Sequence, residues 1–306
     1  MTNVFIDGSA GTTGLRIADR LAVRQDISLI KLSEELRKDP AARKDAINSA
    51  DIVFLCLPDA AAVESAAMVE NPNVKIIDTS TAHRTDPGWI YGFPELAGQR
   101  QKIAQGKRIA NPGCHASGFV ALVAPLVQAE ILPKDISLQC VSLTGYSGGG
   151  KKMIAEYESP DRSPLLKAPR QYALTQQHKH LKEMVALCGL EASPVFCPIV
   201  GDFYSGMEVT VPLFQKDIKG NLDDIRALYQ SYYTGGLVHY EDAAEDGFLS
   251  AGAYTDRDDM GVSVYGNDDR ILLVARFDNL GKGASGAAIQ NLNILMGIQE
   301  VAGLNR

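Results

Sequence analysis

The chain has 306 residues, 45% of them apolar and 22% charged, an ordinary composition for a globular protein of one large or two medium domains. Its formal net charge of −7 and the lack of a basic tract argue against nucleic acid as a partner. No apolar run is long enough to span a bilayer, and residues 1–7 do not resemble a signal peptide, so we expect no membrane partner. Five cysteines without paired spacing indicate no disulfide framework, and the cytoplasm is the simplest location.

A glycine-rich turn near the start of the chain predicts a dinucleotide-binding site. Residues 3–7 form a short apolar strand, residues 8–14 read Gly-Ser-Ala-Gly-Thr-Thr-Gly, and the apolar residues from Leu15 onward follow a helical period. The glycines let the backbone approach a pyrophosphate, which rests on the helix N-terminus. The Gly-x-x-Gly-x-x-Gly spacing is a variant of NADP-linked enzymes, and a purely structural turn is the alternative. The predicted cofactor contacts here are Gly8, Ser9, Gly11, Thr12, Thr13 and Gly14.

The end of the second predicted strand, residues 27–32, favours NADP(H) over NAD(H). An acidic residue here would bind the ribose 2′-hydroxyl, whereas a basic one would accommodate a 2′-phosphate. Ser33 can donate a hydrogen bond to a phosphate, and Arg37 or Lys38 can supply positive charge from the next turn. The acidic residues at 34 and 35 oppose this interpretation, and a solvated helix start is the alternative.

Two further buried strands are predicted at residues 51–58 and 74–78, with a helix at 60–69 between them. Pro58 ends the first of these strands at the carboxyl edge, where parallel sheets bind ligands, and we assign it and Ser80 to the cofactor. Arg84 follows the second strand and can contact a carboxylate or phosphate with two N–H groups, although a surface role is equally compatible. We expect His83 to have no role. Residues 91–96 are predicted to form a packed loop, and residues 108–110 a final short strand.

The run Asn-Pro-Gly-Cys-His-Ala-Ser at residues 111–117 is the turn around which the rest of the chain is organised. Pro112 and Gly113 give strong turn chemistry, and the apolar spacing from Ala116 to Leu126 predicts the buried face of a helix. Cys114 therefore lies at a helix N-terminus, where the dipole stabilises a thiolate. The alternative is a small apolar residue packed under a turn.

The second half of the chain changes its pattern. Strands are predicted at residues 137–143, 207–213 and 271–277, and a helix at 223–233, which together indicate an α+β domain with a mostly antiparallel or mixed sheet. The last helix, after residue 284, has small residues and is expected to pack on the first domain. We therefore predict an α/β Rossmann-type domain at 1–113 plus 284–306, and a catalytic and dimerisation domain at 114–283.

Three segments of this second domain can approach a ligand. Gly145 and Gly148 lie in a glycine loop that begins after a strand, although the P-loop spacing is not met. His178 and His180 are two residues apart, which is not the spacing of a zinc pair on a helix, so we predict no metal site there. One histidine is needed as an acid/base partner for Cys114, and a structural histidine is the alternative. The loop at residues 278–283 is expected to touch the cofactor, although dense helix packing also explains its glycines.

Together these motifs resemble the shorter form of the N-acetyl-gamma-glutamyl-phosphate reductase family, the arginine-pathway relatives of aspartate-semialdehyde dehydrogenase. The resemblance covers essentially the full length, and the motifs around residues 8–14, 111–114, 178–180 and 278–283 occur in the family's order. Residues 78–84 read Asp-Thr-Ser-Thr-Ala-His-Arg, where longer members have Asp-Leu-Ser-Ala-Asp-Phe-Arg. The arginine is kept while its neighbours differ.

The resemblance implies a role for each of these groups. Cys114 is the nucleophile that forms a thioester from an acyl phosphate, and NADPH reduces that thioester to the aldehyde. His178 is the acid/base, His180 lies in the substrate pocket, and Arg84 holds a substrate carboxylate or phosphate. Gly145, Gly148, Asn279 and Gly283 line the nicotinamide, and Asn111 contacts the substrate. The implied partners are the acyl-phosphate substrate and further copies of the chain, as a homodimer or homotetramer.

Three alternatives remain at this stage. The chain could reduce aspartyl phosphate or a carrier-linked aminoadipyl phosphate on the same architecture, although the histidine pair and the run at 278–280 favour the glutamyl substrate. A phosphorylating dehydrogenase of the glyceraldehyde-phosphate type is disfavoured, because its Cys-Thr-Thr-Asn context is absent. A non-catalytic NADPH-binding regulator would be expected to have lost Cys114 or the histidines, and this chain has both.

Overall fold

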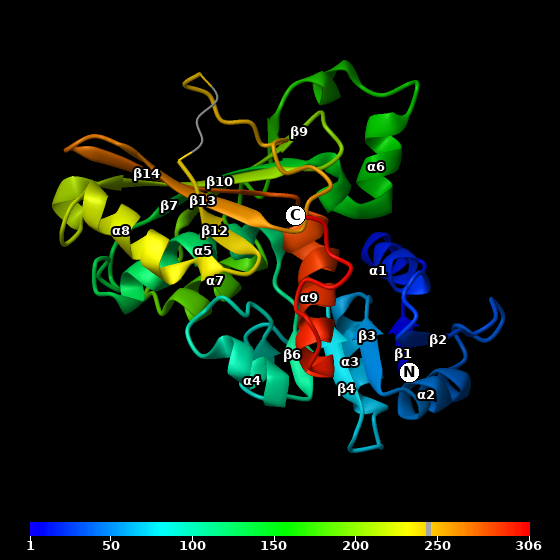
Figure 1. The fold of residues 1–306 in the computed structure, drawn as a ribbon. Helices are drawn as coiled ribbons and strands as arrows, with labels where there is room; N and C mark the ends of the chain where they lie inside the picture. Colours follow the sequence, from blue (N-terminus) through cyan, green and yellow to red (C-terminus); the bar gives the residue numbers. More distant parts are fainter. Residues whose placement is uncertain (243–245) are drawn as a thin grey trace. The chain divides into compact units, whose positions relative to one another are not determined.

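The computed structural model describes residues 1–242 and 246–306 (Figure 1). Contacts within the chain divide it into two compact units. The first unit contains Met1–Pro112 and Ala284–Leu304, and the second contains Gly113–Gly283 and Asn305–Arg306. Among the described residues, no helix has both the length and the apolar character needed to cross a membrane.

The first unit is built on a six-stranded parallel sheet. Its strand order is β2-β1-β3-β4-β6-β5, and every neighbouring pair runs parallel. The strands are β1 (Thr2–Asp7), β2 (Ile27–Ile30), β3 (Ile52–Leu55), β4 (Lys75–Asp78), β5 (Ile90–Tyr91) and β6 (Arg108–Ala110). The predicted Rossmann-type fold of this half of the chain is confirmed. The short edge strand β5 falls at the start of the segment that we predicted to be only a loop, because two residues carry too little pattern to be read from the sequence.

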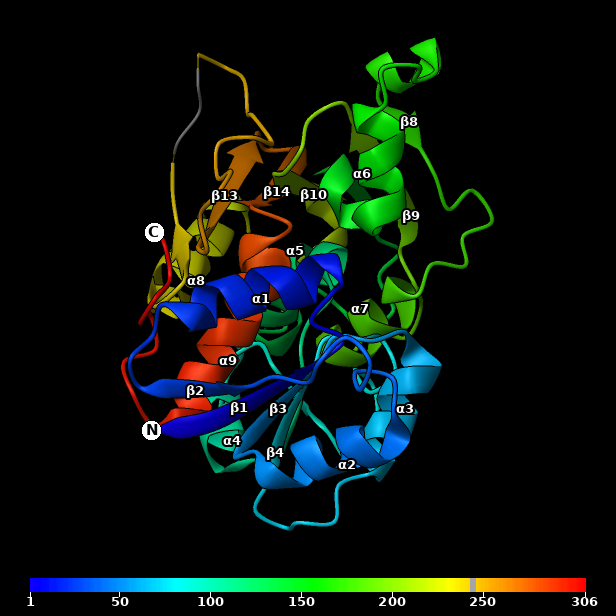
Figure 2. The same cartoon turned by 90° about the vertical axis from the view of Figure 1, so that its right-hand side faces the viewer.

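Helices cover both faces of this sheet (Figure 2). One apolar core joins one face to α1 (Thr12–Ala22), α4 (Gln99–Gln105) and α9 (Gly286–Met296), with Val4 and Phe54 supplied by the strands. A second core joins the opposite face to α2 (Pro40–Ser49) and α3 (Asp59–Ala67), with Phe5 and Val53 supplied by the strands. Consecutive strand residues therefore point into different cores, which explains why the strands are apolar throughout.

The second unit contains an eight-stranded sheet, and the prediction of a mixed sheet in an α+β domain is confirmed. Its order is β11-β12-β13-β14-β10-β7-β9-β8, in which the pairs β12–β13 and β7–β9 are parallel and the others antiparallel. The strands are β7 (Gln139–Gly145), β8 (Arg170–Gln171), β9 (Val195–Gly201), β10 (Met207–Phe214), β11 (Thr234–Gly235), β12 (Val238–Tyr240), β13 (Met260–Gly266) and β14 (Arg270–Phe277).

One face of this sheet packs on α5 (Cys114–Gln128). Helices α7 (His180–Cys188) and α8 (Leu222–Tyr232) lie against α5, and α6 (Gly150–Glu158) follows β7 (Figure 1). Helix α5 is buried on all sides, and a Cβ at Gly118 would lie 2.6 Å from Val209 Cγ2, so the helix lies close against β10. Pro125 cannot donate to the Ala121 carbonyl one turn earlier. The Tyr233 hydroxyl donates to that carbonyl at 2.6 Å, so the Ala121 carbonyl has a hydrogen-bond partner despite the proline.

Candidate functional site

Cys114 is the first residue of α5, as the turn chemistry of residues 111–113 predicted, and the structure shows that it is partly exposed. The residue that precedes the helix is Gly113, which has no side chain to cap it. The first N–H groups of α5 and the positive end of its dipole therefore act directly on the cysteine, which favours the thiolate form. The position combines a nucleophile with backbone donors for a developing oxyanion.

Glu183 fixes the turn before the cysteine. This carboxylate lies on α7, is almost fully buried, and accepts a hydrogen bond of 2.8 Å from the Gly113 N–H. The Ser117 hydroxyl donates to the Gly113 carbonyl at 3.1 Å, so side chains bind Gly113 at both its N–H and its carbonyl. We did not single out Glu183 from the sequence, although it follows His180 by one helical turn.

Three histidine rings lie together beside this helix start. The ring centroids of His178 and His180 are 4.8 Å apart, and each is within 5.6 Å of the His115 ring. His178 precedes α7 and His180 begins it, so an irregular start brings together two residues that a regular helix would separate. The backbone N–H of His180 donates to Nδ1 of His178 at 3.2 Å. Neutral His178 therefore carries its proton on Nε2 and presents it as a donor.

His115 is the histidine that the sequence analysis missed, although it directly follows Cys114. Its Nδ1 lies 2.7 Å from the Ser142 hydroxyl, and its Nε2 lies 2.7 Å from the Tyr172 hydroxyl. Burial, and then the charge of His178, lower the pKa of His115 to about 3, so the ring is neutral near pH 7. Burial, and then the charge of Cys114, raise the pKa of Tyr172, so its phenol stays protonated.

The predicted glycine loops lie in the second unit, and the loop of Gly283 contacts the cysteine. A Cβ at Gly283 would lie 3.0 Å from Cys114 Cβ, and a Cβ at Gly145 would lie 2.5 Å from the Tyr204 carbonyl oxygen. Asn279 is buried and accepts from the Gly206 N–H at 2.9 Å while donating to Ser147 at 3.0 Å. Gly148 lies near the same Asn279 amide. Asn279 thus holds the loop by its side chain, and its cofactor contact stays a prediction.

In the first unit, Arg84 is held by the backbone. Its Nε donates to the Asn111 carbonyl at 2.9 Å and its Nη2 to the Thr79 carbonyl at 3.2 Å. The Asn111 amide donates in turn to the Ala284 carbonyl at 3.1 Å. The two predicted substrate residues of this unit are therefore in direct contact, although they are far apart in the sequence.

Asp78 organises the turn that leads to Arg84. Its carboxylate accepts hydrogen bonds from the Ser80 N–H at 2.9 Å and the Ser80 hydroxyl at 2.8 Å, and it lies 2.6 Å from Nδ1 of His83. The His83 ring stacks on Trp89 with centroids 4.0 Å apart. His83, to which we gave no role, thus anchors this turn, and the Ser80 side chain is engaged in the same network.

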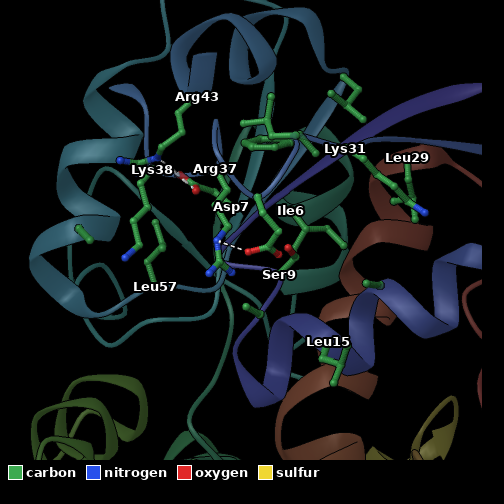
Figure 3. A pocket seen from close by; sticks show the side chains of 18 residues that line it. Ile6, Asp7, Ser9, Leu15, Leu29, Lys31, Arg37, Lys38, Arg43 and Leu57 are labelled. Atoms are coloured by element: carbon green, nitrogen blue, oxygen red, sulfur yellow. Dashed lines mark hydrogen bonds and ion pairs between the residues drawn. The ribbon is translucent and has the colours of Figure 1, made fainter. Parts of the chain in front are cut away.

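The glycine turn of the first unit borders a cavity of about 550 Å³ (Figure 3). Gly8 has φ +89°, and a Cβ there would lie 2.3 Å from the Cys56 carbonyl oxygen, so only glycine fits. Gly11 precedes α1 and leaves its first N–H groups without a side-chain cap. Gly8 and Ser9 line the cavity, while Thr12, Thr13 and Gly14 form the first turn of α1. Pro58 occupies the equivalent position before α3.

Four cationic side chains line this cavity, namely Lys31, Arg37, Lys38 and Arg43. Arg37, Lys38 and Arg43 lie together in the close-up view (Figure 3). Arg43 donates to the buried Asp7 carboxylate through Nε at 3.2 Å and Nη2 at 2.9 Å, and Ser65 donates to Asp7 at 2.5 Å. Arg37 pairs with Glu34 at 2.9 Å. Ser33 does not line the cavity, and its phosphate contact stays a prediction.

These features fit a phosphorylated dinucleotide. Helix α1 offers uncapped N–H groups for a pyrophosphate, the glycines of the turn let the backbone come close to it, and the cations suit a further phosphate. No group of three or more histidine, cysteine, aspartate or glutamate side chains in the described part of the chain has a geometry that could hold a metal ion.

Comparison with known families places both halves of the chain in one group. Residues 3–105 match the family described as semialdehyde dehydrogenase, NAD binding domain. Residues 114–279 match the family described as semialdehyde dehydrogenase, dimerisation domain.

Individual proteins extend this likeness over almost the whole chain. The chain is 45% identical to N-acetyl-gamma-glutamyl-phosphate reductase 2 of a Nostoc species, covering 98% of each chain. It is 44% identical to N-acetyl-gamma-glutamyl-phosphate reductase 2 of Pseudomonas putida, again over 98% of each. Among solved structures, aspartate semialdehyde dehydrogenase II of Vibrio cholerae, complexed with ASA, has a TM-score of 0.74 at 15% identity, covering 97% of this chain and 98% of that one. Aspartate semialdehyde dehydrogenase with NADP from Candida albicans has a TM-score of 0.67 at 15% identity, with the same coverage, so both share the fold.

Proposed function

This chain belongs to the N-acetyl-gamma-glutamyl-phosphate reductase family, and we propose that it reduces N-acetyl-gamma-glutamyl phosphate to the 5-semialdehyde with NADPH, through a thioester on Cys114. The reaction is a step of arginine biosynthesis. The observation that supports the mechanism best is the partly exposed cysteine at the start of α5, beside a cluster of histidines.

Cys114 would perform the covalent step. Its sulfur forms a bond to the acyl carbon of the substrate, and the tetrahedral oxygen formed there accepts hydrogen bonds from the first N–H groups of α5. The bond from that carbon to the phosphate oxygen then breaks, so inorganic phosphate leaves and a thioester remains. When bound, the reduced nicotinamide supplies the hydride that converts the thioester to the aldehyde level. The carbon–sulfur bond then breaks and frees the thiol and the aldehyde.

His178 and His180 would transfer the protons of the reaction. A neutral His178 with its proton on Nε2 is suited to donate to the developing alkoxide. His180 is nearly buried beside it and would contact the substrate or accept the thiol proton of Cys114. A positioned acid or base of this kind contributes roughly 10²–10⁴-fold to the rate.

Arg84 would bind the substrate's carboxylate or phosphate, with Asn111 beside it. Hydrogen bonds to two backbone carbonyls fix the direction of the guanidinium, which lowers the entropy lost when it binds an anion. The glycine turn and the cations of the first-unit cavity would hold the pyrophosphate and the 2′-phosphate of NADP(H).

The reverse reaction tests the substrate. We expect phosphate-dependent reduction of NADP by N-acetyl-glutamate 5-semialdehyde, with aspartate semialdehyde as the control. Activity on the control alone would keep the mechanism and overturn the substrate. A Cys114→Ser variant should bind NADPH and lose turnover, and near-normal activity in that variant would refute the thioester mechanism.

We also propose that the chain forms a homo-oligomer through the open face of the second-unit sheet. Val141, Val195, Phe214 and Leu272 are exposed and lie on the face opposite α5, as their strand positions and register show. Large apolar side chains exposed on one sheet face commonly mark a protein interface. Analytical ultracentrifugation should give a dimer or tetramer, and Leu272→Asp should shift it toward monomer. A wild-type monomer at micromolar concentration would refute this.

A further inference from the structure

Tyr172 and His115 both contact the ring of His178, and the proposed mechanism does not use them. Tyr172 follows β8, and its backbone N–H donates to the Pro198 carbonyl at 3.0 Å, which fixes the residue to β9. Its ring makes edge contacts with the rings of His115 and His178, at centroid distances of 6.1 and 6.0 Å. The hydroxyl is thus held among the histidine rings that lie beside the start of α5.

The buried serine on the far side of His115 decides how the protons are arranged. Within residues 1–242 and 246–306, the Ser142 hydroxyl has His115 Nδ1 as its single hydrogen-bond partner. Ser142 is fully buried, and a buried hydroxyl that cannot donate costs free energy. Ser142 therefore donates to Nδ1, which places the imidazole proton on Nε2. Nε2 in turn donates to the Tyr172 oxygen at 2.7 Å.

This arrangement leaves the hydroxyl hydrogen of Tyr172 for another acceptor. The Tyr172 oxygen uses a lone pair to accept from His115, so its own O–H remains a donor. Burial, and then the negative charge of Cys114, raise the pKa of Tyr172, which keeps the donor in place at neutral pH. The hydrogen bond from His115 Nε2 also polarises the phenol, which strengthens the hydrogen bond that the Tyr172 hydroxyl donates.

We propose that Tyr172 is a further catalytic residue, whose hydroxyl donates a hydrogen bond to the negative charge that forms at Cys114, and that His115 is the positioning residue that aims it. That charge is carried by the thiolate before attack and by the tetrahedral oxygen during it. The inference rests on the proposed role of Cys114 as nucleophile.

Two measurements on a Tyr172→Phe variant test this. Turnover should fall roughly 10²-fold with little change in KM, as for loss of one oxyanion donor. The pH profile of Cys114 alkylation by iodoacetamide distinguishes the two carriers of the charge. A rise of about one pH unit in its inflection assigns the bond to the thiolate, and an unchanged inflection with the rate loss assigns it to the tetrahedral oxygen. Both quantities unchanged would overturn the proposal.

Variants of His115 test its role and provide the controls. His115→Gln keeps an amide donor near Nε2 and should retain much of the activity, whereas His115→Phe should lose as much as Tyr172→Phe. The double variant should be no slower than Tyr172→Phe alone, and additive losses would overturn the positioning role. Tyr232→Phe, on α8, is the matched control and should match the wild type. Wild-type activity on a different acyl phosphate would overturn the proposed substrate and leave these comparisons valid.

Discussion

The buried Glu183 carboxylate accepts a hydrogen bond from the backbone N–H of Gly113, so α7 fixes the turn that presents the nucleophile. Replacement by glutamine keeps an oxygen acceptor for that N–H, whereas alanine leaves it buried without a partner. We expect Glu183→Ala to lose about 1–3 kcal/mol of unfolding free energy and to reduce turnover more than Glu183→Gln. Urea denaturation and steady-state kinetics of both variants measure this. Equal damage in the two would contradict the role of the acceptor.

Asparagine substitutions at His178 and His180 show which of the two histidines is the acid/base. In His178→Asn, the new amide oxygen can still accept from the His180 N–H, so the backbone is retained while the proton donor is lost. Turnover should fall roughly 10²–10⁴-fold, and His180→Asn should cost less. Single-turnover kinetics of both variants are the measurement. A larger loss at His180 would exchange the two roles.

Arg43 offers a test of cofactor choice. Asp7 holds its guanidinium at the edge of the first-unit cavity, where charge is needed for a 2′-phosphate. Arg43→Met should raise the KM for NADPH about 10–100-fold, as expected for the loss of a charge-assisted bond, and change the KM for NADH little. Arg100→Met is the matched control, since Arg100 lies on α4 and pairs with Glu300. An equal change in the KM for NADPH and for NADH would show that Arg43 does not bind the 2′-phosphate.

The burial of His115 predicts how the free energy of unfolding depends on pH. Burial lowers its pKa to about 3 in the folded protein, whereas the unfolded chain has the ordinary value near 6.5. Below pH 6.5 the unfolded state binds a proton that the folded state does not, so stability falls as pH falls toward 3. The loss approaches about 1.4 kcal/mol per pH unit. Unfolding titrations at pH 7 and pH 5 should show a smaller loss for His115→Gln than for the wild type. Identical losses would mean that His115 titrates normally.

The sequence predicted the elements whose pattern is local. The apolar runs at residues 51–58 and 74–78 identified buried parallel strands, and the turn at 111–113 located Cys114 at the start of α5. The contacts that organise the site are not local. Asp7 meets Arg43 because α2 packs on the face of the sheet into which Phe5 points, and no spacing of charges along the chain encodes that contact.

The same limit applied inside the site. His115 was overlooked because a histidine on an apolar helix has no distinguishing pattern, and its partners come from β7 and from the residue after β8. Glu183 could have been noticed, since it follows His180 on the same helix. Its bond to Gly113 depends on how α7 packs beside α5, which hydrophobic periodicity does not specify.

The discontinuous first unit has a consequence for the order of synthesis. Helix α9 completes the core beneath β1 and β3 with Ile289 and Leu292, yet residues 113–283 leave the ribosome before it does. At 5–20 residues per second, the nascent sheet waits on the order of ten to thirty seconds with that face uncovered. The part of the chain that is translated first can thus mature last.

A chain that stops at residue 283 should bind a hydrophobic dye far more strongly than the full chain, and equal binding would show that the sheet closes without α9.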